Sequence, residues 1–264
     1  MDFIAPGTLR RRAESRWRHA LVTGALEPLS TEVEEVEDGG ARFQVRVVSS
    51  LVAKARAAAA PPKKNPFALP WEADLVVGDV SSTHGCLLNK FPVFEHHLLL
   101  VTRVYEPQEA WLTAADGEAL RFCLDEGGDA LGFYNGGAGA GASQPHKHLQ
   151  VVPMKASLEP LIRSGRLPVR HRLVDTPKDG ASLAEEVRRA LEALHVAPGA
   201  PWNLLATREW TLVVPRRAEA WEDVSVNALG FAGSLLVKTR AQLERVREVG
   251  PMAVLCAAGV ARGV

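Results

Sequence analysis

The chain is poor in cysteine, carries no net charge and lacks long apolar runs. Its 264 residues include three cysteines, Cys86, Cys123 and Cys256, which are far apart and form no Cys-x-x-Cys pair. An odd number of distant cysteines argues against a disulfide framework and predicts buried or idle thiols in a reducing cytoplasm. No run reaches the ~20 apolar residues of a membrane span, and residues 1–30 contain no run resembling a signal peptide. We therefore expect a cytoplasmic protein with no membrane partner.

The charge balance excludes a strongly basic surface. Thirty-one basic and 31 acidic residues cancel, so no global field predicts a nucleic-acid partner, although five arginines cluster between residues 10 and 18. A hydrophobic content of 47% over 264 residues is enough for one large domain or two small ones. We predict a single catalytic domain over residues 1–264, with a division into a nucleotide-binding core at 1–175 and a C-terminal part at 176–264 as the alternative. The sequence gives no indication of the oligomeric state.

Hydrophobic periodicity and capping patterns predict a mixture of strands and helices. Strands are predicted at 43–51, 75–80, 86–91, 97–104, 131–135, 146–152, 203–206 and 211–215, and a loop at 57–70. Helices are predicted at 9–21, with Leu9, Ala13, Trp17 and Leu21 on one face, from a Thr113–Asp116 capping box to Gly127, from a second box at Ser182–Glu185, and over about 229–249. Because the strands form antiparallel-looking clusters with helices between them, we predict the α+β class.

The most informative stretch runs from Asn135 to Gln150 and reads N-G-G-A-G-A-G-A-S-Q-P-H-K-H-L-Q. In an extended strand alternate side chains share a face, so His146, His148 and Gln150 project together while the residues between and beyond them face the core. Glycines let backbone N–H groups come close to phosphate oxygens, and imidazole is a competent nucleophile. The stretch therefore predicts a nucleotidyl-transfer site.

Two other phosphate-binding patterns fit the glycines less well. Gly137-x-Gly139-x-x-Ala142 matches a dinucleotide fingerprint, but that fingerprint requires a helix to begin there. Pro145 and the period of two from His146 argue against such a helix. No Lys-Ser/Thr pair follows the glycines, so a P-loop is excluded. A flexible hairpin connection is the remaining alternative to a loop that binds phosphate.

Four stretches together carry a family resemblance. The run G-A-S-Q-P-H-K-H-L-Q at 141–150 resembles the active-site strand of the histidine-triad superfamily, and Gln as third member is typical of its transferase branch. That branch contains galactose-1-phosphate uridylyltransferases and diadenosine tetraphosphate phosphorylases (ATP adenylyltransferases). Residues 65–67 (N-P-F), 87–102 (L-L-N-K-F-P-V-F-E-H-H-L-L-L-V-T) and 227–233 (N-A-L-G-F-A-G) resemble the phosphorylases in particular. The resemblance covers nearly the whole chain and implies an antiparallel sheet with helices packed against it.

The resemblance implies a catalytic role for each polar member of the strand. His148 would attack the phosphorus, His146 would contact leaving-group or phosphate oxygens, and Gln150 would donate its amide to a non-bridging oxygen. An attacking imidazole must be neutral, with its other nitrogen donating to a fixed acceptor. A carbonyl near Asn135 and the carbonyl of His146 are both open as that acceptor. Gln150 has no proton to give, which favours transfer over hydrolysis.

Further residues are candidates for binding the substrate. They are Lys54, Asn89, Lys90, Asn135, Gly141, Ala142, Ser143, Gln144, Asn227, Gly230 and Lys238. Gly136 stands where the phosphorylase pattern has serine, which removes one expected hydroxyl contact. His96 and His97 belong to the strand that borders the nucleotide pocket in the superfamily. Arg216 and Arg217 end a predicted strand, where contact with phosphate is open but solvation is the usual state.

The predicted activity is nucleotidyl transfer without a resident metal. Without a Cys-x-x-Cys pair, and with His84-x-Cys86 and His96-His97 as poor substitutes, we predict no structural zinc. A Mg²⁺ ion is expected only with the polyphosphate of the substrate. The resemblance implies phosphorolysis of diadenosine tetraphosphate to ATP and ADP, and the reverse transfer, through a covalent AMP–histidine intermediate, with adenine (di)nucleotides and inorganic phosphate as partners. The alternatives are a nucleotidyltransferase with a sugar-1-phosphate acceptor, a dinucleoside polyphosphate hydrolase, and a catalytically silent adenine-nucleotide sensor.

Overall fold

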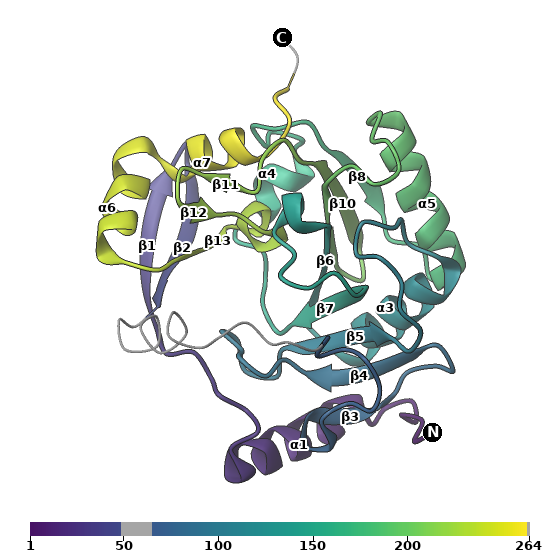
Figure 1. Ribbon diagram of the computed structural model, residues 1–264. Coiled ribbons are helices and arrows are strands. Elements are labelled where there is room, and N and C mark those ends of the chain that lie inside the picture. Colours follow the sequence, from purple (N-terminus) through teal and green to yellow (C-terminus); the bar gives the residue numbers. More distant parts are fainter. Residues whose placement is uncertain (49–64, 263–264) are drawn as a thin grey trace.

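The computed structural model describes residues 1–48 and 65–262 and is built around one eight-stranded sheet (Figure 1). The strand order is β3-β4-β5-β7-β6-β9-β10-β8, and every neighbouring pair is antiparallel. The strands are β3 Val76–Asp79, β4 His84–Leu88, β5 Leu98–Thr102, β6 Leu131–Gly136, β7 His148–Val152, β8 Arg172–Asp175, β9 Trp202–Ala206 and β10 Trp210–Pro215. The predicted α+β class is confirmed. Strands from both sides of residue 175 join this one sheet.

Three helices cover one face of the large sheet. They are α1 Leu9–Thr23, α3 Ala114–Glu126 and α5 Gly180–Ala193. Their apolar faces share one buried cluster with strand residues that include Leu149 and Val151, as the alternation in the sequence predicts. The capping box at Thr113 and Asp116 is present, and it fixes where α3 begins. None of the helices in the described residues is long and apolar enough to cross a membrane.

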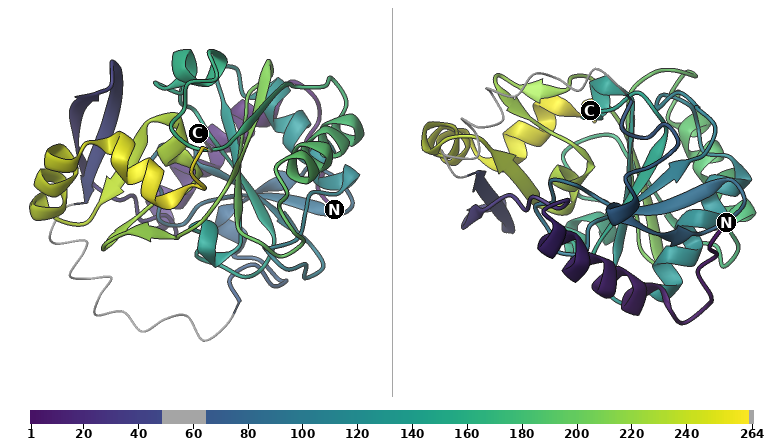
Figure 2. Two further views of the ribbon diagram at one scale, coloured as in Figure 1. Left: turned by 90° about the horizontal axis from the view of Figure 1, so that it is seen from above. Right: turned by 60° about the horizontal axis from the view of Figure 1, so that its bottom comes forward.

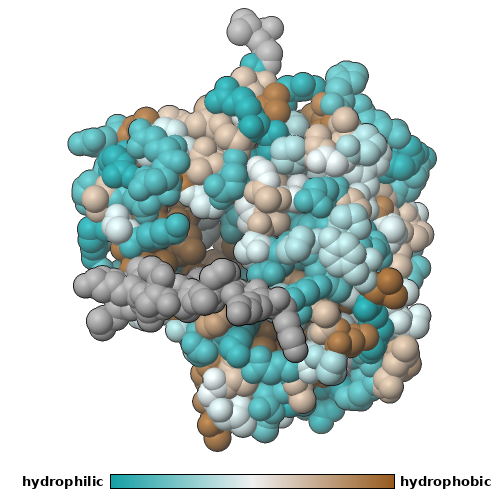
Figure 3. Space-filling view, viewed as in Figure 1, coloured by the Kyte–Doolittle hydropathy of each residue, from teal (hydrophilic) through white to brown (hydrophobic). Residues whose placement is uncertain are grey.

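A second, smaller layer packs against part of the opposite face. It consists of the three-stranded sheet β1-β2-β13, the short pair β11-β12 and the helices α4, α6 and α7 (Figure 2). Their bounds are β1 Thr31–Asp38, β2 Ala41–Val48, β11 Ala220–Trp221, β12 Val224–Ser225, β13 Ser234–Val237, α4 Glu159–Arg163, α6 Arg240–Val249 and α7 Pro251–Ala258. A hollow with hydrophobic side chains is visible beside this layer (Figure 3).

The predicted inner face of the first helix is wrong at its end. Ala20 is fully buried and Leu21 is 44% exposed. An α-helix advances by about 100° per residue, so position 20 lies about 20° from Leu9 around the axis and position 21 about 120°. A spacing of four therefore drifts off the buried face over three turns.

Two predicted helix boundaries in the C-terminal part are also wrong. The cap of α5 is Asp179, whose carboxylate accepts from the backbone N–H of Ser182, so Ser182 lies inside the helix. The long helix expected over 229–249 is instead a 3₁₀ turn at Ala228–Ala232, the strand β13 and the helix α6. Gly233 lies between the 3₁₀ turn and β13 with a φ of 94°, and a Cβ there would clash with Ser157 Oγ. Pairing of β13 with β2 then outweighs the helical periodicity.

Candidate active site

The predicted catalytic strand lies in the middle of the large sheet, between β5 and β6. In β7, His148 pairs with Val101 and Gln150 with Leu99, so both polar side chains lie on the face away from α1, α3 and α5. Regular pairing begins only at His148, whereas the expected strand begins at His146. His146 forms an isolated bridge with Pro107. Both imidazoles nevertheless lie against the same ring, Phe67, at centroid distances of 6.1 and 4.8 Å.

A chain of hydrogen bonds fixes the orientation of both imidazoles. The backbone N–H of Phe67 donates to Asn65 Oδ1 (2.9 Å), so Asn65 Nδ2 donates to His146 Nδ1 (2.9 Å). His146 Nε2 then carries the proton and donates to the carbonyl of Thr102 (2.8 Å). His148 Nδ1 in turn donates to the carbonyl of His146 (2.9 Å). Of the two acceptors that the sequence left open, the structure therefore selects the carbonyl of His146.

This arrangement leaves His148 neutral, with an unused lone pair. Among the described residues nothing bonds to its Nε2, and a ring nitrogen whose partner carries the proton is a nucleophile. Burial lowers the pKa of His148 to about 4, against the opposing effect of the bond to the His146 carbonyl. The ring is thus unprotonated at neutral pH without a neighbouring base.

A parallel chain orients Gln150. The backbone N–H of Phe91 donates to Asn89 Oδ1 (3.1 Å), which turns Asn89 Nδ2 toward His97 Nδ1 (3.2 Å). His97 Nε2 then donates to Gln150 Oε1 (2.9 Å), and burial lowers the pKa of His97 to about 4. With its oxygen occupied, Gln150 has only its amide N–H groups left to offer. No described residue accepts from them, so they are available to an oxygen of the substrate.

The side chain of Gln108 holds the nucleophile by its backbone. It is fully buried and makes hydrogen bonds to the backbones of β6 and β7 where these two strands no longer pair with each other. Its Oε1 accepts from the backbone N–H of His148 (2.8 Å), and its Nε2 donates to the carbonyls of Asn135 (2.9 Å) and His148 (3.1 Å). The two strands separate at this point, since their regular pairing ends at Phe133 and Gln150.

The glycine stretch after β6 is a compact loop rather than the start of a helix. It contains one 3₁₀ turn, Ala138–Ala140, between Gly137 (φ 89°) and Gly141 (φ 90°). A Cβ on Gly141 would lie 2.9 Å from Cα of Asn227, so glycine is required for this contact as well as for the dihedral angle. The dinucleotide fingerprint is therefore excluded by geometry. The loop also brings two of the predicted binding residues, Gly141 and Asn227, together.

Asn135 is oriented by two donors. Its Oδ1 accepts from Asn203 Nδ2 (2.9 Å) and from the backbone N–H of Ala228 (2.9 Å). No described residue accepts from its own Nδ2, so Asn135 resembles Gln150 in having only donors to spare. Asn227 caps the following 3₁₀ turn through its side chain and is only partly buried.

The other predicted binding residues lie in different environments, and not all of them are at the site. Ala142, Ser143 and Gln144 continue the loop at or near the surface, and the side chains of Ser143 and Gln144 make no hydrogen bond with the described residues. Lys90 is paired with Glu72 (3.0 Å). Two residues are not brought to the site: Gly230 packs in the core against Val226, Leu235 and Leu255, and Lys238 is exposed beyond β13. Lys54 lies outside the described residues.

Two expectations about neighbouring residues need correction. Arg216 is 4% exposed rather than solvated, and it bonds to Asn203 Oδ1 (2.6 Å); Arg217 is exposed. Gly136 does not leave a hydroxyl missing from the site. A Cβ there would meet the indole nitrogen of Trp202 at 2.5 Å, on the face that the helices cover.

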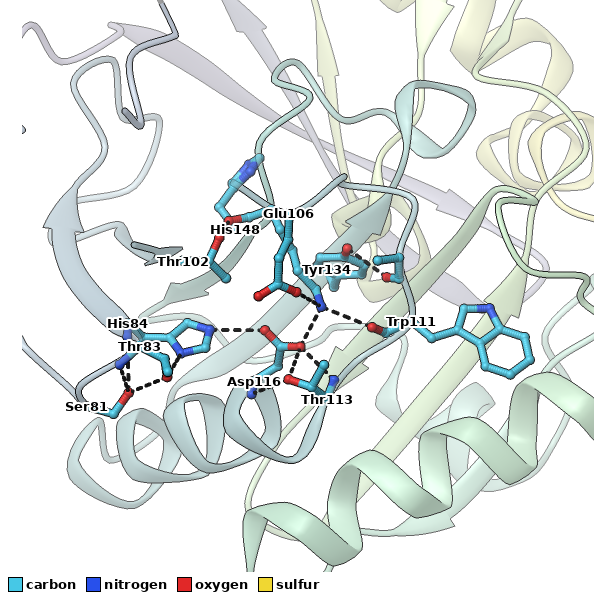
Figure 4. Close-up of polar contacts among 12 residues, drawn as sticks. Ser81, Thr83, His84, Thr102, Glu106, Trp111, Thr113, Asp116, Tyr134 and His148 are labelled. Carbon is cyan, nitrogen blue, oxygen red and sulfur yellow. Dashed lines mark hydrogen bonds and ion pairs between the residues drawn. The ribbon is translucent and has the colours of Figure 1, made fainter. Parts of the chain in front are cut away.

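On the opposite face of the sheet, beside the start of β7, lies a charged cluster made of His84, Glu106, Asp116 and Lys147, which is buried except for Glu106 (Figure 4). Lys147 Nζ donates to Asp116 Oδ2 (2.6 Å), Glu106 Oε2 (3.0 Å) and the carbonyl of Trp111 (3.0 Å). Although burial opposes it, the bond from His84 and the charge of Lys147 hold the pKa of Asp116 at about 2. In residues 1–48 and 65–262 no group of three His, Cys, Asp or Glu side chains is arranged to hold a metal ion.

Sequence reasoning missed several residues that shape the site. Gln108 and Asn203 carry no local signal, because the partners of their side chains lie 13 to 69 residues away in the chain. His97 and Asn65 did carry one, since both belong to stretches that resemble the phosphorylases, but the residue that each contacts was not predictable. Phe67 was visible in the same Asn-Pro-Phe stretch.

Comparisons with protein families and with known sequences give matches over nearly the whole chain. The family model described as "Ap4A phosphorylase N-terminal domain" matches residues 1–173, and the one described as "ATP adenylyltransferase C-terminal domain" matches residues 165–261. Two proteins of Saccharomyces cerevisiae are each 27% identical over 293 aligned positions. They are Protein APA1, with 92% of this chain and 91% of the relative covered, and diadenosine 5',5'''-P1,P4-tetraphosphate phosphorylase 2, with 91% and 90%.

Solved structures give the same result for the fold. Yeast Ap4A phosphorylase Apa2 in complex with Ap4A is similar with a TM-score of 0.81 and 25% identity, covering 97% of this chain and 98% of that one. The same enzyme in complex with AMP is similar with a TM-score of 0.79 and 25% identity, covering 97% and 99%. The antiparallel sheet and its helices are thus shared over nearly the full length of both chains.

Proposed function

Since this chain belongs to the Ap4A phosphorylase family, with an ATP adenylyltransferase C-terminal domain, we propose that it catalyses phosphorolysis of diadenosine tetraphosphate. The products are ATP and ADP, and the reverse adenylyl transfer uses the same site. Adenine nucleotides and inorganic phosphate are then its partners. The observation that carries the mechanism is the unused Nε2 lone pair of His148 beside the oriented amide of Gln150.

In the first step His148 Nε2 attacks the α-phosphorus of one AMP unit. The N–P bond forms as the P–O bond to the bridging oxygen breaks, and the electron pair leaves with that oxygen on ATP. The leaving group is an anion stable at neutral pH, so no acid is needed to protonate it. The positive charge that develops on the ring is stabilised where Nδ1–H meets the His146 carbonyl.

In the second step an oxygen of inorganic phosphate attacks the same phosphorus. A new P–O bond forms, the P–N bond breaks and its electron pair returns to His148 Nε2, which releases ADP and restores the neutral ring. Phosphate arrives as an anion and needs only to be positioned, whereas water needs a base. Neutral Gln150 supplies hydrogen bonds to the equatorial oxygens in both steps but no proton transfer.

The glycine loop and Asn135 complete the proposed phosphate site. The backbone N–H groups of Gly137, Ala140, Gly141 and Ala142 already bond within this segment. The remaining donors near the strand are the backbone N–H groups of Ala138, Gly139, Ser143 and Gln144, the Asn135 amide and the Ser143 hydroxyl. Lys54 and Lys90 are proposed contacts to the polyphosphate. Among these, Lys90 must first exchange Glu72 for phosphate. We keep Mg²⁺ as a companion of the polyphosphate, without a carboxylate cage of its own. The proposal places the enzyme in the cytoplasm, consistent with the free thiols of Cys86, Cys123 and Cys256.

Product analysis with and without phosphate tests this function. With diadenosine tetraphosphate and excess phosphate we expect ATP and ADP in equal amounts, and turnover that nearly stops when phosphate is removed. Gln150→His should increase release of AMP, because a third histidine can assist water. If the wild-type protein in excess phosphate gives chiefly AMP and ATP, it is a hydrolase and the proposal is wrong.

A further inference from the structure

Arg216 is a buried cation without a carboxylate partner. Arg216 is 4% exposed, and no described carboxylate forms an ion pair with it. Burial lowers the pKa of its guanidinium to about 10, although the charge of Glu219 raises it, and the group is still protonated at neutral pH. A charge left unpaired away from water is costly, and such a group is more often found at a functional site than in an ordinary core. Its acceptors are the carbonyls of Ala140, Ala218, Glu219 and Ala258 and the side-chain oxygen of Asn203.

Two of these contacts connect Arg216 with the phosphate-binding elements. One guanidinium nitrogen donates both to the carbonyl of Ala140 (3.1 Å), inside the glycine loop, and to Asn203 Oδ1 (2.6 Å). Asn203 Nδ2 donates to the same Ala140 carbonyl (3.0 Å) and to Asn135 Oδ1 (2.9 Å). With its oxygen occupied, Asn135 keeps only its amide N–H groups for a ligand. Arg216 thus supports the loop backbone directly, and it supports the Asn135 side chain through the neutral amide of Asn203.

We propose that Arg216 is a positioning residue and a fixed positive charge for the phosphate groups that bind at the glycine loop. Each of its five N–H donors already has a protein acceptor, so Arg216 acts on the ligand through its charge and through Asn203 rather than by a direct hydrogen bond. An anion at the loop and the folded loop then stabilise each other. The inference deepens the proposed function and rests on it for the identity of the nucleotide. The phosphate could be that of the nucleotide or the inorganic acceptor, because both offer the same oxygens. The alternative is that Arg216 only ties the loop to the carbonyls of Ala218, Glu219 and Ala258.

Binding of AMP and of inorganic phosphate, measured separately by calorimetry, tests the proposal. Arg216→Met should raise Kd for at least one of the two ligands by about tenfold or more, because a charge in a poorly solvated site interacts strongly. Arg216→Lys should restore part of the affinity. Arg217→Met, which removes the exposed neighbouring arginine, should stay within about twofold of wild type. A folded Arg216→Met variant that binds both ligands like wild type overturns the proposal.

A second pair of variants decides the question if Arg216→Met does not fold. Asn203→Asp and Asn203→Leu both remove the donors to Ala140 and Asn135, but only the aspartate neutralises the guanidinium. The proposal predicts weaker phosphate binding by Asn203→Asp than by Asn203→Leu, although the new ion pair should make it the more stable of the two. Equal Kd values for the two variants would show that Arg216 has only a structural role and would contradict the proposal.

The wild-type measurement separates this inference from the proposed function. Wild-type protein that binds inorganic phosphate but not AMP contradicts the proposed function, and the phosphate measurements then decide the role of Arg216. Wild-type protein that binds neither ligand contradicts both.

Discussion

Strand β7 carries two polar clusters, one on each face, and they differ in what they leave unused. On the helix-covered face, Lys147 lies in the charged cluster, where each of its three N–H donors has an acceptor. On the open face, His148 and Gln150 are also buried and also hydrogen-bonded, but each retains one group without a partner among the described residues. Burial and polarity alone therefore do not distinguish the two.

The difference lies in spare bonding capacity. Lys147 and Asp116 form an ion pair, and the low pKa of Asp116 reflects the bond from His84 and the charge of Lys147 rather than a reactive group. His148 is held by one nitrogen only, and its low pKa keeps the other nitrogen free to attack. Two adjacent residues at the start of β7 thus have different roles. Lys147, just before the strand, fixes it to α3, and His148, its first residue, is held in place for the reaction. The predictions below test this division of roles.

The largest effect is expected from His148→Ala. Removal of the nucleophile should lower kcat by about 10³-fold or more, at least about 4 kcal/mol of barrier, while nucleotide binding persists. His171→Ala is a matched control, because His171 Nδ1 also bonds to the carbonyl two residues before it (2.8 Å). His171 lies just before β8 rather than in β7. Steady-state kinetics and AMP binding measure both variants. More than a tenth of wild-type activity in His148→Ala would exclude it as the nucleophile.

Lys147→Met should affect stability more than chemistry. It leaves Asp116 buried without its cation, which should cost about 3 kcal/mol in the free energy of unfolding. The folded fraction should keep kcat within about tenfold of wild type. Lys155→Met, which breaks the exposed pair with Asp129, should change stability by no more than ~0.5 kcal/mol. Urea unfolding and kinetics of the same samples measure this. A stable Lys147→Met variant with little activity would show that the two faces of β7 are not separable.

His97→Phe tests the orientation of Gln150 with a smaller expected effect. Without the donor at His97 Nε2, the Gln150 amide can rotate, and kcat should fall by about tenfold, or 1.4 kcal/mol. The effect should appear in kcat rather than in KM for the dinucleotide. Asn89→Leu should give a similar but weaker change, since it removes only the group that fixes the tautomer of His97. A wild-type kcat in His97→Phe would show that the hydrogen bond from His97 is not what orients Gln150.

Stability should fall in acid because two buried imidazoles stay neutral. The pKa values of His97 and His148 are about 4 when folded and 6.5 for an unperturbed ring. Between these values the unfolded chain binds more protons, so stability present above pH 6.5 is lost as pH falls toward 4, by about 0.7 kcal/mol per ring from pH 7 to 6. Urea unfolding across this range should show a smaller slope for His97→Phe. An unchanged slope would mean that His97 is not buried in its neutral form.

Local periodicity predicted this site better than it predicted the surrounding fold. The alternation at His146, His148 and Gln150 depends only on strand geometry, and the family resemblance supplied their proposed chemistry. The contacts that orient them, from Asn65, Gln108 and His97, join distant segments and were not predictable from the sequence. The helix predicted over 229–249 failed for the same reason, because pairing between β2 and β13 is a tertiary interaction that local propensity does not include.

The most direct test of the account is to trap the intermediate. The wild-type protein is incubated with diadenosine tetraphosphate without phosphate, digested, and searched by mass spectrometry for a peptide that carries an adenylyl group. We predict one acid-labile adduct on His148 that is absent from His148→Ala. When phosphate is added, this adduct should disappear and its adenylyl group should be recovered in ADP. An adduct on another residue, or steady turnover by an enzyme that never forms one, would contradict the assignment of His148 as the nucleophile.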